Sequence, residues 1–175
     1  MNAVIRIGGG AALIGGLLRF CAAFVPYAPN SPWLEAFYAV IDANLLVGLI
    51  GIFMAWCDRA RGWGLAGFVI ALIGQGSIIG PDATQFGIDF YVAGSLILLA
   101  GLTLMSIDMM RAEVMRPVAA LWLVAVGMAG ASPIAGETAI LAAGAAFGAA
   151  FVYAGAIMLA RPSAGIQDPA TSIAD

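Results

Sequence analysis

The sequence predicts an all-α, polytopic integral membrane protein with six transmembrane helices arranged as three hairpins and with both termini in the cytoplasm. Three observations predict this fold class. Of the 175 residues, 63% are hydrophobic and 10% are charged, and the mean hydropathy is +1.02. Six apolar segments are long enough, or nearly long enough, to cross a bilayer. The arginines fall on one side of the membrane if these segments alternate in direction.

Each helix is predicted from an apolar segment that ends at a turn signal. A spanning helix needs about 20 predominantly apolar residues, with about 17 as the lower limit. The segments are 4–25, 34–57, 63–79, 88–110, 117–131 and 138–160, and the fifth, which is short and glycine-rich, fits the pattern least. The stretches between them carry the prolines, glycines and charges typical of turns: PYAPNSPW, CDRARG, GPDATQFG, RAEVMRP and SPIAGE.

The first segment is predicted to be retained as a helix. Arg6 followed by an apolar run is the start of a signal-peptide pattern, but Arg19 interrupts the hydrophobic region that such a peptide needs. We therefore expect an uncleaved first transmembrane helix. The first and third segments also share a short string, ALIGG at Ala12 and ALIGQ at Ala71, which is consistent with an internal duplication but does not establish one.

The distribution of charge predicts the orientation. Cytoplasmic loops accumulate lysine and arginine. With six alternating helices, every arginine except Arg19 falls on one side, namely Arg6, Arg59, Arg61, Arg111, Arg116 and Arg161. The opposite side carries Glu35, Asp82, Asp89 and Glu137. We therefore expect a bacterial-type inner membrane protein, in which residues 162–175 form a polar, disordered cytoplasmic tail.

Arg19 lies inside an apolar segment and requires a partner. With a rise of 1.5 Å per residue, Arg19 and Asp42 fall at matching depths on the first two helices, so an Arg19–Asp42 pair is predicted. Gln75, Ser95 and the slightly deeper Asn44 extend a polar layer in the outer half of the bundle. Two interpretations stay open: a pair that only fixes helix register, and a site for a small anionic or lipid-like ligand.

Three carboxylates are predicted to surround the outer mouth of this layer: Asp82, Asp89 and Glu137. Asp82 and Asp89 are seven residues apart, a spacing that places them on one face of a helix and is compatible with a hard cation. Capping of the fourth helix by Asp82 or Thr84 is the better interpretation, because the six or more oxygens that calcium prefers are not assembled. We expect no metal site.

The residue types present exclude several function classes. The sequence has no histidine and no lysine, which excludes histidine-ligated haem, a lysine Schiff base and a Ser-His-Asp triad. No clustered basic face suggests nucleic-acid binding. GWGLAG (62–67) has the glycine spacing of a dinucleotide fingerprint but lacks the preceding strand. We therefore expect neither an enzyme nor a cofactor, and membrane lipids as the principal partners.

Two functions fit this pattern. The first is binding or transport of the anionic or lipid-like ligand at the outer polar layer. The alternative is an accessory or assembly subunit of a larger membrane complex. Helix 138–160 is rich in alanine and glycine and contains Gly144 and Gly148 in the spacing that lets helices approach closely. Gly76 and Gly80, at the end of the third segment, have the same spacing. Such a helix is either central to the fold or a contact surface for a partner protein or a second copy.

Overall fold

A computed structural model describes residues 2–25, 31–79, 84–85 and 87–160 of the chain. Its elements are α1 (Asn2–Ala22), α2 (Pro32–Met54), a 3₁₀ turn η1 (Cys57–Arg59), α3 (Gly62–Ile78), the antiparallel two-residue strands β1 (Thr84–Gln85) and β2 (Ile88–Asp89), α4 (Phe90–Arg111), α5 (Arg116–Ala135) and α6 (Glu137–Ala160). Five of these helices are long and apolar enough to cross a membrane, while α3 is apolar but has only 17 residues. The prediction of a helical, multi-pass integral membrane protein is confirmed at this level.

The helix ends differ from the predicted ones for local reasons. Helix α2 begins at Pro32, two residues early, because a proline in the first turn lacks only an N–H that would have no intrahelical partner. Helix α4 begins at Phe90 because Ile88 and Asp89 belong to β2. Helix α5 continues to Ala135, past the predicted end at 131, because Pro133 lies in its last turn and removes a single hydrogen bond. The predicted tail lies outside the described residues.

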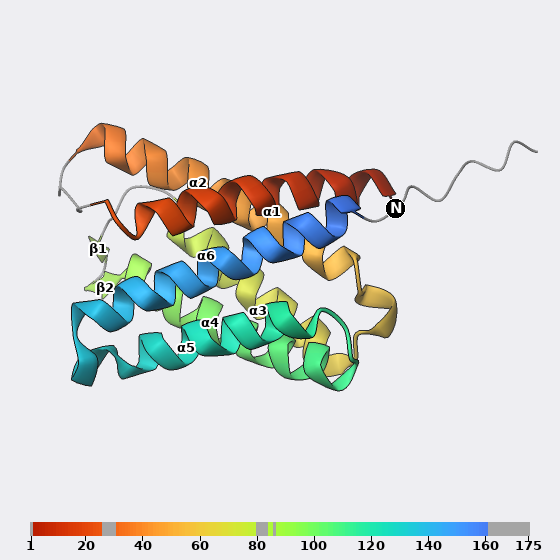
Figure 1. Cartoon of the computed structure of the whole chain (residues 1–175). Coiled ribbons are helices and arrows are strands. Elements are labelled where there is room, and N and C mark those ends of the chain that lie inside the picture. Colours follow the sequence, from red (N-terminus) through yellow and green to blue (C-terminus); the bar gives the residue numbers. More distant parts are fainter. Residues whose placement is uncertain (1, 26–30, 80–83, 86, 161–175) are drawn as a thin grey trace, which may run out of the picture.

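The helices run back and forth along one axis, so the helix termini lie at the two ends of the bundle (Figure 1). Helix α1 begins and α6 ends at the same end of the bundle (Figure 1). We call this the arginine-rich end, because Arg6, Arg59, Arg61, Arg111 and Arg116 lie in or beside the helix ends there. The opposite end, where α2, α4 and α6 begin, is called the acidic end and carries the exposed side chains of Glu35, Asp89 and Glu137.

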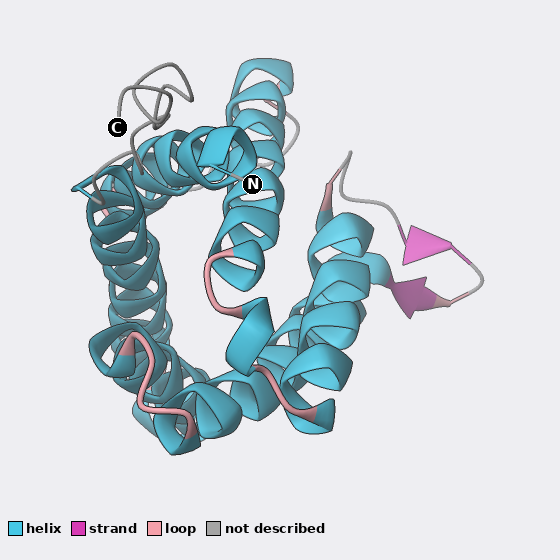
Figure 2. Cartoon of the chain, turned by 90° about the vertical axis from the view of Figure 1, so that its right-hand side faces the viewer, coloured by secondary structure: helices cyan, strands magenta, loops and turns pink. Residues whose placement is uncertain are grey.

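The six helices form a closed ring (Figure 2). Each helix packs against its neighbours in the sequence, and α6 packs back against α1. The interfaces α3–α4, α1–α6 and α1–α2 are the most extensive. The α2–α3 interface is the least extensive between consecutive helices.

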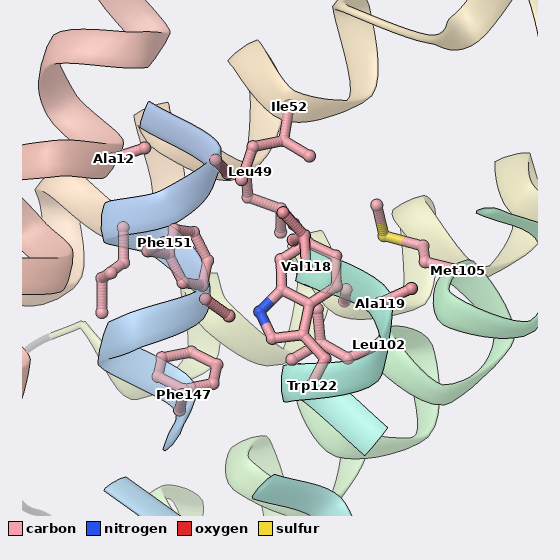
Figure 3. Packing of buried hydrophobic residues seen from close by; sticks show 14 of the residues in the cluster. Ala12, Leu49, Ile52, Leu102, Met105, Val118, Ala119, Trp122, Phe147 and Phe151 are labelled. Atoms are coloured by element: carbon pink, nitrogen blue, oxygen red, sulfur yellow. The ribbon is translucent and has the colours of Figure 1, made fainter. Parts of the chain in front are cut away.

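Apolar side chains fill the interior of the ring (Figure 3). Trp122 of α5 is fully buried and packs against Phe151 of α6 with ring centroids 5.6 Å apart. Leu49 of α2 and Leu102 of α4 approach the same region (Figure 3). Outward-facing residues such as Ile7, Ile73 and Leu96 are more than half exposed, as expected for a surface in contact with lipid.

Pairs of adjacent glycines let α1 touch two helices at backbone distance. Gly15 faces α2, where a Cβ added to it would lie 2.9 Å from the Asn44 Cβ. Gly16 faces α6, where a Cβ would lie 2.7 Å from the Gly148 carbonyl oxygen. Gly8 and Gly9, one heptad earlier, divide in the same way between α2 and α6. Helix α1 is therefore clamped between its two neighbours.

The two ALIG strings have equivalent packing roles. A Cβ added at Gly48 of α2 would lie 2.8 Å from the Ala12 Cα, and one added at Gly101 of α4 would lie 2.7 Å from the Ala71 Cα. Both alanines thus face a glycine of the following helix. The internal duplication remains a prediction, and this shared geometry is consistent with it.

Helix α6 uses two glycines for packing within the chain. Gly148 and Gly155 both lie against the backbone of α1, and the nearest neighbour of Gly144 is the Ala23 Cβ at 3.9 Å. In the other predicted packing motif, the described glycine is not used in this way. Gly76 is exposed, and a Cβ added there would meet no atom within 4 Å, while Gly80 lies outside the described residues.

Candidate functional site

The register of α1 on α2 places Arg19 within about two residues of the level of Asp42. Gly8 faces Gly51, Ala12 faces Gly48, and Gly15 faces Asn44. Continuing this antiparallel register by four residues puts Arg19 opposite positions 40–41 of α2. Arg19 lies three residues before the end of α1 at Ala22, which is about 4.5 Å along the helix axis.

Arg19 interacts with Asp42 electrostatically but does not form a contact ion pair with it. The charge of Arg19 acts on the Asp42 carboxylate. No carboxylate of the described residues lies within 4 Å of the Arg19 guanidinium. The contact ion pair that the described residues do form, between Arg116 and Glu113 at 2.7 Å, lies at the other end of the bundle. Both Arg19 and Asp42 are half-buried. With respect to the described residues, the guanidinium therefore keeps N–H donors for another acceptor.

The direct hydrogen-bond partner of Asp42 is Gln75 of α3. The Gln75 Nε2 donates to Asp42 Oδ1 at 3.2 Å and to the Asp42 backbone carbonyl at 3.3 Å. Gln75 is 2% exposed, so its amide is held between the helices. The polar layer thus brings together one side chain from each of α1, α2 and α3.

The two remaining predicted members lie apart from this cluster. Asn44 turns its amide back to its own helix, donating to the Val40 carbonyl oxygen at 2.8 Å. Ser95 of α4 is half-buried and forms no side-chain hydrogen bond with another described residue. The geometry therefore supports a cluster of Arg19, Asp42 and Gln75, to which Asn44 and Ser95 form no hydrogen bond.

The predicted acidic mouth is described for two of its three residues. Asp89 is exposed and caps α4, since its Oδ1 accepts a hydrogen bond from the Val92 N–H at 2.9 Å. This corrects the predicted cap at Asp82 or Thr84, because Thr84 belongs to β1 and helix α4 begins only after Asp89. Glu137 is exposed in the first turn of α6, where its charge complements the helix dipole. Asp82 lies outside the described residues.

A second polar cluster, which the sequence analysis missed, lies at the arginine-rich end. Asp108 of α4 is fully buried, and its Oδ2 accepts a hydrogen bond from the Arg61 N–H at 2.8 Å. Arg61 is the residue that precedes α3, so Asp108 supplies a cap from a neighbouring helix. The sequence does contain a signal for this cluster: a carboxylate within the apolar segment 88–110, since ionisable residues in membrane spans are functional candidates by default.

The GWGLAG motif is explained by this packing. A Cβ added at Gly64 would overlap Asp108 Oδ2 and lie 2.6 Å from the Trp56 ring. A Cβ at Gly67 would lie 2.7 Å from the Met105 backbone nitrogen. The motif opens a membrane-type helix that packs closely on α4, with no preceding strand among the described residues. Its glycines therefore serve packing, as expected from their context.

Comparison of the chain with protein-family models, with curated proteins and with solved structures gives no match in any of the three. The functional argument therefore rests on the chemistry of the site. An arginine without a contact ion pair among the described residues, beside a carboxylate that accepts from an amide, provides positive charge and directional N–H groups for an anion.

Proposed function

We propose that this protein binds an anionic group of the phosphate or carboxylate class at Arg19, either on a lipid headgroup or on a small solute that it transports. The observation that carries the proposal is Arg19 itself, a half-buried residue whose guanidinium forms no contact ion pair with the described residues. Arginine remains charged in proteins and binds oxyanions through two parallel N–H groups.

The surroundings of Arg19 are consistent with an anion that binds reversibly to its guanidinium. A contact pair with Asp42 would neutralise the guanidinium, but Asp42 Oδ1 accepts instead from Gln75. Because Arg19 lies one turn from the end of α1, its side chain can extend toward the headgroup region or toward solvent. Asp42 then acts as a resting counter-charge that an incoming anion displaces.

The orientation of the site is part of the proposal. We take all six helices, α3 included, as spans arranged in three hairpins, with the arginine-rich end in the cytoplasm of a bacterial cell and both termini there. The short α3 is compatible with a span if the bilayer thins locally or its flanking residues extend the apolar stretch. The Arg19 cluster then lies in the outer half of the inner membrane.

The test compares ligand-induced stabilisation of matched arginine variants. Unfolding of the purified protein is followed in mixed micelles with added inorganic phosphate, and in nanodiscs of phosphatidylcholine with or without phosphatidylglycerol. A ligand at 100 times its Kd stabilises the folded state by about 2.7 kcal/mol. We expect one of these additions to stabilise the wild type and Arg59→Gln, an exposed arginine at the other end, but not Arg19→Gln.

The two ligand arms distinguish a soluble anion from a headgroup. Arg19→Lys is expected to keep only part of the effect, because an ammonium cannot form the two-pronged contact. Equal stabilisation of wild type and Arg19→Gln by every addition would refute the anion site. A stoichiometric protein partner that co-purifies with the chain in gentle detergent would favour the accessory-subunit alternative.

A further inference from the structure

We propose that α3 and α4 form a rigid pair that moves against α2, and that the Gln75–Asp42 contact is the latch that holds this boundary closed at the acidic end. We call the boundary the α2–α3 seam. The inference deepens the proposed function and rests on it, because the latch and the Arg19 anion site share Asp42. It states how access to that site is controlled.

The α3–α4 pair is locked at backbone distance along its length. A Cβ added at Gly67 would lie 2.8 Å from the Gly101 carbonyl oxygen, and one at Gly74 would lie 2.7 Å from the Gly94 carbonyl oxygen. Between these points Gly101 meets the Ala71 backbone. Asp108 joins the pair at its arginine-rich end by accepting from Arg61. Two helices in such contact cannot slide or separate without losing many contacts at once.

The seam between α2 and α3 is built differently. It is the least extensive interface between consecutive helices, and no described glycine brings the two backbones together there. Two specific contacts cross it. One is the Gln75 amide on Asp42, and the other is the stacked pair of Phe53 and Phe68, with ring centroids 4.1 Å apart and planes 6° apart.

The positions of these two contacts define the direction of movement. Phe53 is one residue from the end of α2, next to the η1 connection to α3, so the aromatic stack lies close to the point where the chain joins the two helices. Gln75 is thirteen residues into α3, about 20 Å from that connection. Rotation about the connection would therefore separate Gln75 from Asp42 while the aromatic stack stays together.

Opening of the seam removes the hydrogen-bond donor of Asp42 and leaves the charges of Arg19 and Asp42 in place. Arg19 and Asp42 belong to the clamped pair α1–α2, whereas Gln75 belongs to α3. An anion on Arg19 competes with Asp42 for the guanidinium and offers the Gln75 amide a second acceptor. Binding at Arg19 is therefore expected to weaken the latch, and release of the latch to open a path to Arg19.

The test measures spin-label distances in the full chain in nanodiscs, with Cys21 and Cys57 replaced by serine. The reporter across the acidic end of the seam is Ala43→Cys with Ser77→Cys. A matched control shares one label, Ser77→Cys with Leu96→Cys, and spans the rigid α3–α4 pair. A second control, Met54→Cys with Leu65→Cys, reports on the seam near its connection. All five positions are exposed or half-buried on the outside of the helices.

The latch is broken by Gln75→Leu, which removes both hydrogen bonds at similar volume, or by Gln75→Met if the first variant does not fold. We expect the Ala43–Ser77 distance to lengthen by more than about 2 Å, the scale of a genuine rearrangement, with both controls unchanged. Inorganic phosphate added to the labelled parent is expected to move the same pair in the same direction.

The outcomes separate this inference from the anion site. An Ala43–Ser77 distribution as narrow as that of the α3–α4 control, and unmoved by the Gln75 variants, overturns the seam even if phosphate binds through Arg19. Lengthening in the Gln75 variants supports the seam even if no anion stabilises the protein. Equal lengthening of all three pairs indicates general loosening of the bundle and also overturns the inference.

Discussion

Substitution of Gly155 by alanine tests whether α6 is held against α1 by backbone contact. A Cβ added at Gly155 would lie 2.6 Å from both the Gly9 carbonyl oxygen and the Leu13 nitrogen, and 3.0 Å from the Leu13 Cα. All three are backbone atoms, so no side chain can rotate away. Ordinary contacts of a Cβ begin at 3.4 Å, so α1 and α6 must separate locally by about 0.8 Å.

The expected loss follows from two opposing terms. Insertion of one carbon into a close-packed interface costs about 1–3 kcal/mol. Alanine in a helix interior is favoured over glycine by about 0.5–1 kcal/mol. The difference between these terms lies between about 0 and 2.5 kcal/mol. Because the contacts at 2.6 Å are with backbone atoms, Gly155→Ala is expected in the upper part of this range, with a loss of about 1–2 kcal/mol. At Gly127 of α5, where an added Cβ meets no atom within 4 Å, only the favourable term remains.

The assay is reversible unfolding in mixed micelles of a mild and a denaturing detergent, followed by far-ultraviolet circular dichroism. Gly127→Ala is the matched control, because it makes the same chemical change on an outward face. The expected result is a lower midpoint for Gly155→Ala and an equal or higher midpoint for Gly127→Ala. If Gly155→Ala is as stable as the wild type and Gly127→Ala is the one that loses stability, the assignment of internal and external helix faces is wrong.

Two further predictions use the same unfolding assay. Asp108→Ala is expected to destabilise the protein by about 1–3 kcal/mol, because the partly buried hydrogen bond from the Arg61 N–H to the carboxylate is lost, and hydrogen bonds to charged groups are the stronger ones. Asp108→Asn keeps an acceptor oxygen and should lose less, and a reversed order would contradict the capping role. Trp122→Ala is expected to cost about 3–5 kcal/mol, since the indole is fully buried in the centre of the ring. The loss of stability in Trp122→Phe should be much smaller, because the indole N–H has no hydrogen-bond partner within the described part of the chain. Equal losses in Trp122→Phe and Trp122→Ala would show that the side chain does not act by filling the space between the helices.

The length of the apolar segments and the turn residues between them allowed the helical, multi-pass architecture to be predicted, because both depend on local sequence. The level of Arg19 against Asp42 followed from the helical rise alone. The hydrogen-bond partner of Asp42 did not, because the choice between Arg19 and Gln75 depends on how α3 rotates against α2. Asp108 was overlooked because it lies near the end of an apolar segment, where a charge resembles an interfacial residue; its burial depends on Gly64 of another helix.

The close packing of α1 explains how a charge can be kept in this part of the bundle. Gly8, Gly9, Gly15 and Gly16 bring α1 into backbone contact with α2 and α6, so Arg19, three residues beyond Gly16, has a fixed position on the helix. A charge inside the membrane is costly, and a helix without such close contacts would tilt or shift to move the charge toward water. The double clamp prevents that relaxation, and the seam beside Asp42 is the place where the bundle can still yield. Asp42 therefore has a rigid helix contact with α1 on one side and a sparse, polar contact with α3 on the other. For this reason we expect access to Arg19 to be controlled at this carboxylate rather than in the packed core.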